Sequence, residues 1–399
     1  EMKQSFFLCL LIILWSKIGF AQFTPNELRF NLYNYNFFVN NEYKGERVSG
    51  YTLPGFRLTP TLSYSLEENL FIEGGVSLLH YWGANKYPNV VYSNLPSWAG
   101  DQFQRGVHAV PFFRAVWQIN RSLRFSLGNI DYRNLHGLSE PLYNLENTFS
   151  GDPEMGLQLK ADTKWFKGDL WLNWQTFVFK NSSHNETFCL GLASQTKILR
   201  KEKFELSLPF NIIIQHLGGE SLQIKSNINS WVNASLGLKG KINFSRDFSL
   251  YFGGDYLIYN QLSGNIMPFK DGFAQFYYIG AKLKKINMKI AYFDSEDFVS
   301  LLGSGHFCNF SSNTPGLVFD RANQFYAKID YNYLISQKYN IKFYCQLWKQ
   351  NKITGDRLLP DYSAIDPSFP AKVIRDGFFS FSVGVVLSLE PSFLIKNFD

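Results

Sequence analysis

The sequence predicts an all-β protein, a single antiparallel transmembrane β-barrel of about sixteen strands with short periplasmic turns and long extracellular loops. Three observations support this prediction. Apolar and polar residues alternate along most of the chain, the segments that join the alternating runs are short and long in turn, and aromatic residues make up 18% of the chain. After residue 22 no apolar run approaches the roughly 18 residues of a membrane-spanning helix, so a helical membrane protein is excluded.

Residues 155–180 show the alternation most clearly. Successive side chains of a strand point to opposite faces. We expect Leu157, Leu159, Leu170, Leu172 and Trp174 to face lipid, and Lys160, Asp162, Asn173 and Gln175 to face the lumen. A short break at 165–168 separates the two halves and should form a periplasmic turn. A strand needs about 9 to 11 residues of this repeat to cross a bilayer. A soluble β-sandwich could contain the same hairpin, so the choice between a sandwich and a transmembrane barrel depends on the rest of the chain.

The first residues have the pattern of a secretory signal peptide. Lys3 supplies a positive charge, residues 6–15 form an uncharged apolar run, and Gly19 and Ala21 are small residues of the kind that a signal peptidase reads. A membrane anchor is the alternative, but the apolar run is short for a spanning helix and Lys17 interrupts its end. We therefore expect residues 1–21 to be removed during export through the inner membrane.

Composition narrows the class further. The 39 Phe, 22 Tyr and 9 Trp suit a barrel with Phe facing lipid and with Tyr and Trp at the membrane interfaces. The net charge of +6 is too small to indicate nucleic acid binding. Cys189, Cys308 and Cys345 give no disulfide framework and no metal-ligand spacing, and the six histidines are scattered. We predict neither a metal nor a cofactor.

Sixteen alternating runs can be followed along the chain. They cover about 28–39, 56–66, 70–83, 106–119, 123–132, 155–164, 169–178, 186–198, 203–217, 227–244, 247–260, 273–284, 286–293, 323–335, 339–350 and 377–389. Short polar turns, such as 67–69, 120–122, 200–202, 245–247, 284–285 and 336–338, follow every second run. The largest of the other connections are 84–104, 133–153, 294–322 and 351–376, and the first of these contains Pro88 and Pro96.

The strict alternation of short and long connections favours the barrel. An antiparallel barrel with short periplasmic turns and long external loops produces it directly, whereas a soluble Greek-key sandwich would not keep one end consistently short. An even number of strands also places both termini on the periplasmic side. Closure would remove the open sheet edges, which lipid cannot hydrate.

The signal peptide, the sixteen runs, the loop asymmetry and the size resemble the porin-type β-barrels of Gram-negative outer membranes. The resemblance covers residues 22–390 and is architectural, since no short motif is diagnostic of one porin family. Residues 391–399 depart from it, because such chains usually end on an aromatic residue that closes the last strand. The resemblance implies an outer-membrane location, contact with outer-membrane lipid, and either a homo-oligomer or a partner in a surface complex.

In porin-like barrels the third external loop folds into the pore, and here that loop is 133–153. We predict that the pore lining and constriction are formed by Arg114, Arg124, Lys160, Asp162, Asn173, Gln175, Glu140, Glu146, Asp152, Glu154, Lys328 and Asp330. An acidic loop that faces basic wall residues would set up a transverse field and orient polar solutes. The alternative is that these charges are ordinary solvated groups.

Inward aromatic residues allow a sugar-stacking role, because flat rings stack on pyranose faces. The candidates are Trp171, Trp231, Tyr278, Tyr344 and Trp348. The alternative is that they belong to the aromatic belts found near strand ends.

The function predicted from the sequence is a channel for diffusion or selective uptake of small hydrophilic solutes, without enzymatic activity. Two alternatives stay open. One is a loop-plugged, non-transporting barrel that serves as a docking or assembly component of a surface or secretion complex. The other is a barrel hydrolase that assembles Ser and His across strands on its outer face. The segment 303–306, Gly-Ser-Gly-His, resembles a nucleophile loop only superficially, because it lacks the strand-turn-helix setting.

Overall fold

A computed structural model describes residues 23–44, 47–82, 107–176, 185–218, 228–312, 316–336, 338–351, 353–358 and 377–398. The signal peptide expected at 1–21 and the loop expected at 84–104 lie outside the described residues. None of the described helices is long and apolar enough to cross a membrane.

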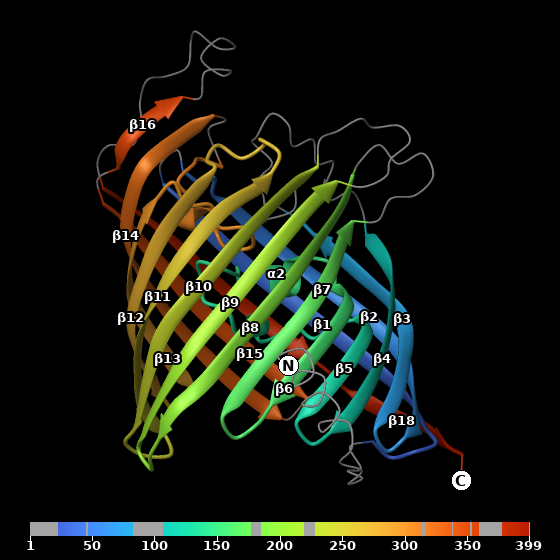
Figure 1. The fold of residues 1–399 in the computed structure, drawn as a ribbon. Coiled ribbons are helices and arrows are strands. Elements are labelled where there is room, and N and C mark those ends of the chain that lie inside the picture. Colours follow the sequence, from blue (N-terminus) through green and yellow to red (C-terminus); the bar gives the residue numbers. More distant parts are fainter. Residues whose placement is uncertain are drawn as a thin grey trace, which may run out of the picture.

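Strands make up almost all of the regular structure (Figure 1). They are β1 (Glu27–Glu42), β2 (Tyr51–Glu67), β3 (Leu70–Tyr81), β4 (His108–Asn120), β5 (Leu123–Asn129), β6 (Met155–Asp162), β7 (Phe166–Thr176), β8 (Glu186–Arg200), β9 (Phe204–Gly218), β10 (Asn229–Asn243), β11 (Phe248–Ser263), β12 (Asp271–Leu283), β13 (Ile286–Glu296), β14 (Leu317–Ser336), β15 (Tyr339–Gln350), β16 (Thr354–Leu358), β17 (Phe378–Leu389) and β18 (Ser392–Asn397). The short helices are η1 (Leu135–Gly137), α2 (Asn147–Ser150) and η2 (Gly305–Phe307).

The sheet closes on itself as a barrel of sixteen antiparallel strands, which confirms the predicted fold class. Each strand from β1 to β15 pairs with its neighbour in sequence, β15 pairs with β17, and β17 pairs back with β1. The strand β16 pairs with the first residues of β14 beyond the barrel wall. The residues expected as a C-terminal tail include β18, which continues along β1 after Pro391, so the last strand extends past 389.

The two faces of the wall differ as the alternation predicts. Large apolar side chains cover the outer face, among them Leu157 and Leu170, which are 41% and 44% exposed. Their neighbours Lys160 and Asn173 point into the lumen. The short turns lie at the lower end of the barrel in Figure 1, together with the C-terminus. This end is the periplasmic one in a barrel with long external loops.

Two connections fold back inside the barrel. The first is 133–153, which includes η1 and α2, and the second is 297–312, which includes η2. Both carry buried side chains, such as Leu142, Phe149 and Phe307. These side chains join the inward residues of the wall in two apolar clusters. The wall residues Trp171 and Trp231 are 1% and 0% exposed as a result. The outer half of the lumen therefore has an apolar core of its own.

The orientation of the hairpin β6–β7 can be tested with single cysteines at 159 and 160, with Cys189, Cys308 and Cys345 replaced by Ala. The parity predicts that Leu159→Cys in lipid vesicles resists a water-soluble maleimide, whereas Lys160→Cys reacts through the lumen. Mass spectrometry of the intact protein measures both reactions. Equal labelling at the two positions would contradict the assignment of the two faces.

Candidate functional site

The third external loop, 133–153, lies inside the barrel, and its acidic side chains contact the wall. Glu140 accepts hydrogen bonds from Lys289 Nζ, with both oxygens at 2.9 Å, and Lys328 Nζ lies 3.6 Å away. Burial would raise the pKa of Glu140, but these two lysines hold it well below its usual range. Glu146 accepts from the Tyr51 hydroxyl at 2.7 Å, and burial raises the pKa of Glu146 to about 7. The loop is thus joined to both sides of the wall.

His136 is the most tightly held group of this loop. Its Nδ1 lies 3.0 Å from Asp169 and its Nε2 lies 2.9 Å from Glu154, so both ring nitrogens donate to carboxylates. The ring stacks on Trp171 with centroids 3.8 Å apart, and the Tyr143 hydroxyl donates to Glu154 at 2.6 Å. Burial lowers the pKa of His136, but the two carboxylates outweigh it and raise that pKa to about 9. A buried imidazolium therefore fixes the loop to β7.

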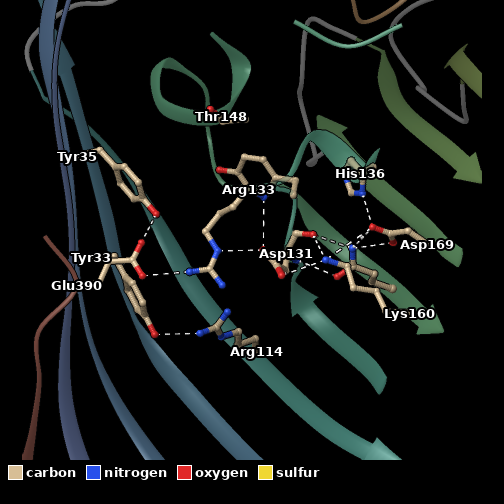
Figure 2. Close-up of polar contacts among 12 residues, drawn as sticks. Tyr33, Tyr35, Arg114, Asp131, Arg133, His136, Thr148, Lys160, Asp169 and Glu390 are labelled. Carbon is tan, nitrogen blue, oxygen red and sulfur yellow. Dashed lines mark hydrogen bonds and ion pairs between the residues drawn. The ribbon is translucent and has the colours of Figure 1, made fainter. Parts of the chain in front are cut away.

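A second polar network lies in the lumen on the β1–β6 side (Figure 2). The Arg114 guanidinium donates to Glu73 at 2.6 Å and to the Tyr33 hydroxyl at 3.0 Å. Arg133 bridges Asp131 at 3.0 Å and Glu390 at 3.1 Å. Further contacts drawn in Figure 2 join Lys160 to Asp131 and Asp169 and Tyr35 to Glu390.

A small cavity opens within this network. Its lining includes Tyr33, Tyr35, Arg57, Arg114 and Arg133. Its volume is about 60 Å³. Because a single water needs roughly 10 to 15 Å³ of such space, the cavity suits a few water molecules rather than an organic substrate.

The residues predicted to form the constriction all belong to the lumen wall or to the loop inside it, but they do not converge on one point. Within the described part of the chain, the carboxylates of the loop contact Lys289, Lys328, His108 and His136 rather than Arg114, Arg124 and Lys160. The remaining predicted residues have separate partners. Asp330 contacts Lys328 and Lys342, Arg124 donates to Gln118, and Asp152 contacts His108. Gln175 accepts from Gln215, Asn173 accepts from the backbone of Met155, and Asp162 lies at the periplasmic turn beside Lys167. Their role in selecting solutes stays a prediction.

A different pair of residues lies on the outer face of the barrel. His216 on β9 and Ser230 on β10 are direct partners in the sheet, and His216 Nδ1 lies 2.8 Å from Ser230 Oγ. Their neighbours Gln215 and Trp231 point inward and are 4% and 0% exposed, so the pair points outward toward lipid. Both residues lie near the external ends of their strands. The Phe188 ring on β8 stacks against His216 with centroids 4.8 Å apart.

The wall below this pair is apolar. The next row of outward residues toward the periplasm is Leu190, Ile214 and Val232, which are direct partners across β8, β9 and β10. A serine hydroxyl within hydrogen-bond reach of an imidazole nitrogen is the arrangement of a nucleophile and its general base. The pair lies at the external edge of this apolar wall.

A second serine–histidine contact occurs inside the barrel. Ser304 Oγ lies 3.1 Å from His306 Nδ1, in the segment that the sequence singled out. The His306 ring is buried against Trp348, with centroids 4.3 Å apart, and burial lowers its pKa well below the usual value. Because this pair is enclosed by loops and wall within the lumen, membrane lipid has no approach to it.

Among the described residues, no group of three or more His, Cys, Asp or Glu side chains could hold a metal ion. Cys189, Cys308 and Cys345 are free.

A closed barrel with an apolar outer wall, a charged lumen and short turns at one end defines an outer-membrane β-barrel. The sequence matches the family described as Lipid A 3'-O-deacylase-type over residues 20–398. The chain belongs to this family. A search of curated proteins gave no match.

Solved porin structures share the architecture at low sequence identity. The outer membrane protein OprD from Pseudomonas aeruginosa is 9% identical, with a TM-score of 0.46 and coverage of 94% of this chain and 96% of that chain. OccAB4 of Acinetobacter baumannii is 11% identical, with a TM-score of 0.45 and coverage of 94% and 100%. The anion-selective porin from Comamonas acidovorans is 10% identical, with a TM-score of 0.42 and coverage of 91% and 99%.

The expectation of a barrel without enzymatic activity is wrong, since the family that matches nearly the whole chain is named for an enzymatic activity. The sequence prediction also missed the outer-face pair. The outward direction of the His216 and Ser230 side chains could be predicted from the sequence, because each residue lies between inward residues in an alternating run. The register that puts them opposite each other depends on strand pairing, and no short motif reveals it.

The His136 contacts predict a pH dependence of stability. Because the pKa is raised, the imidazolium contributes fully below about pH 6.5 and its contribution is lost as the pH rises through about 9. We expect the free energy of unfolding to fall by about 3 kcal/mol over that range, and His136→Gln to remove most of the dependence. Urea unfolding followed by tryptophan fluorescence measures it, with His80→Gln on the outer face as the control. An unchanged profile in His136→Gln would contradict the assignment.

Proposed function

We propose that this protein is an outer-membrane ester hydrolase that removes an acyl chain from a lipid A-type glycolipid of the outer leaflet. Ser230 is the nucleophile and His216 is the general base. The single observation that carries the proposal is the 2.8 Å contact between these two side chains on the lipid-facing wall near its external edge. Membership in the Lipid A 3'-O-deacylase-type family supports the choice of reaction and substrate.

The reaction follows from the geometry of the pair. With His216 neutral, Nδ1 accepts the hydroxyl proton as Ser230 Oγ attacks the ester carbonyl carbon. The bond to the alcohol oxygen of the sugar breaks, that oxygen takes the proton back from His216, and the acyl group stays on Ser230. Water then gives a proton to His216 and attacks the acyl carbon, and Ser230 Oγ leaves with that proton. The stacked Phe188 ring restricts the orientation of His216 throughout.

The surroundings suit a lipid substrate. An acyl chain would lie along the row of Leu190, Ile214 and Val232, and an ester at the level of Ser230 would put the sugar at the external edge. Each buried methylene of such a chain contributes roughly 0.8 kcal/mol. Binding therefore depends mainly on the apolar wall, and the pair supplies the chemistry.

Substitution of the pair should abolish hydrolysis. We expect Ser230→Ala and His216→Gln each to lower the rate of acyl release from purified lipid A by at least about a thousandfold, because residues of such a pair act as a unit. Mass spectrometry of the lipid measures the loss of one acyl chain. Heat-modified mobility on gels verifies that both variants remain folded barrels.

Two matched serine variants define the site. Ser194→Ala removes an outer-face hydroxyl that donates to the Phe210 carbonyl at 2.9 Å, and it should retain full activity. Ser304→Ala removes the hydroxyl of the lumen pair and should also retain it. Loss of activity in Ser304→Ala with full activity in Ser230→Ala would contradict the proposal and place the reaction in the lumen.

Diffusion of small hydrophilic solutes through the lumen is a second candidate function. It is favoured by the charged side chains that face the lumen and keep contact with solvent, such as Lys160 and Lys342, whose side chains are 22% and 25% exposed. A solute would have to pass beside the loops at 133–153 and 297–312. Planar-bilayer recording tests this role: conductance steps that persist in Ser230→Ala would support it, and their absence from the folded protein would exclude it.

A further inference from the structure

The periplasmic half of the lumen carries a concentration of lysines on β10 and β12–β15. We call this surface the lysine basin, formed by Lys239, Lys241, Lys282, Lys289, Lys328 and Lys342. Strand pairing brings several of them into one row, because Lys241 is opposite Tyr251, Tyr251 opposite Gly280, Gly280 opposite Lys289, and Lys289 opposite Lys328.

The carboxylates of the basin balance only part of this charge. Glu140 contacts Lys289 and Lys328, Asp330 contacts Lys328 and Lys342 at 3.5 and 3.6 Å, and Asp255 also faces the lumen. Within the residues described, Lys239, Lys241 and Lys282 form no ion pair. Glu205 on β9 lies opposite Lys241 and contacts Lys197 at 3.2 Å. With this pair included, seven lysines and four carboxylates leave an excess of three positive charges. Like charges held together in a confined space attract an anion.

Two tyrosine rings lie over glycines of the wall between these lysines, with their planes tilted by 55°. A Cβ at Gly280 would approach the Tyr251 ring to 2.2 Å, and one at Gly253 would approach the Tyr278 ring to 2.6 Å. Each ring therefore occupies the space above a glycine, and Lys289 Nζ lies over the Tyr278 ring at 5.1 Å from its centroid. The Tyr251 hydroxyl is held by Asn287 Oδ1 at 3.0 Å. Glycines are needed here because any side chain would lift the rings off the wall.

Access to the basin is from the periplasm. The loop that carries Glu140 lies against Lys289 on the external side of the basin. Toward the other end, Lys282 is exposed although it points inward, so solvent enters there. The short turns of this end are seen at the bottom of Figure 1.

We propose that the lysine basin binds a phosphorylated sugar that enters from the periplasm. Unpaired lysines suit the phosphate, for which lysine is a common ligand. The Tyr251 ring, which is fixed through its hydroxyl by Asn287, suits the apolar face of a pyranose ring. The basin is separate from the outer-face pair of His216 and Ser230, so binding here is independent of the proposed hydrolysis.

Calorimetric titration of the folded barrel in detergent with glucose 6-phosphate tests the site. We expect saturable binding at low salt, at least tenfold weaker binding of inorganic phosphate, and no binding of glucose. Equal affinity for inorganic phosphate and the sugar phosphate would overturn the role of Tyr251. Absence of saturable binding would overturn the proposal as a whole.

Variants locate the binding within the molecule. The triple substitution Lys239→Gln, Lys241→Gln and Lys282→Gln should weaken binding by at least tenfold, whereas the matched triple at Lys201, Lys203 and Lys284 in the periplasmic turns should leave it unchanged. Tyr251→Leu should weaken the binding of glucose 6-phosphate but not the binding of inorganic phosphate. Ser230→Ala should bind as the parent does, which separates this result from the test of hydrolysis. Equal losses in the two lysine triples would show that net charge, not the basin, attracts the anion.

Discussion

The pairing of β17 and β18 with β1 is the constraint on which the rest of the structure depends. In lipid, each unpaired backbone group costs several kcal/mol, so an open edge of this sheet could not face the membrane. Antiparallel pairing removes that edge, because β1 pairs with β2 over Leu28–Asn41 and, on its other side, with β18 over Glu27–Asn31 and with β17 over Asn34–Glu42. Closure then gives every strand one lipid face and one lumen face, and the parity of each residue decides its surroundings.

The two faces satisfy their polar groups in different ways. In the lumen, several buried charges contact opposite charges, as in the contacts of His136 with Glu154 and Asp169, and others, such as Glu146, are held by neutral hydrogen-bond partners, because an isolated buried charge is too costly. On the outer wall, a polar side chain has no such partner network and must pair locally. His216 and Ser230 do so with each other across two strands. A polar pair in an apolar wall is expensive to place there, and the proposed reaction at the lipid surface would account for it.

Much of the fold could be predicted from the sequence, because alternation with a period of two is a local signal. The runs predicted at 155–164 and 169–178 lie within three residues of the observed strands at 155–162 and 166–176, and the turn predicted at 165–168 comes earlier, at 163–165. The inward folding of loop 133–153 followed from the resemblance to porins. The contacts of that loop could not be predicted, since Glu140 meets Lys289 only through a separation of 149 residues. The pairing of His216 with Ser230 likewise depends on register, and register is a property of the whole sheet.

The central claim is that Ser230 is a nucleophile activated by His216. A fluorophosphonate that reacts only with activated serines tests it most directly, with the labelled residue located by peptide mass spectrometry. The account predicts a label on Ser230 that is absent from His216→Gln and unaffected by Ser304→Ala. A label on Ser304, or a folded barrel in which Ser230 does not react, would contradict it.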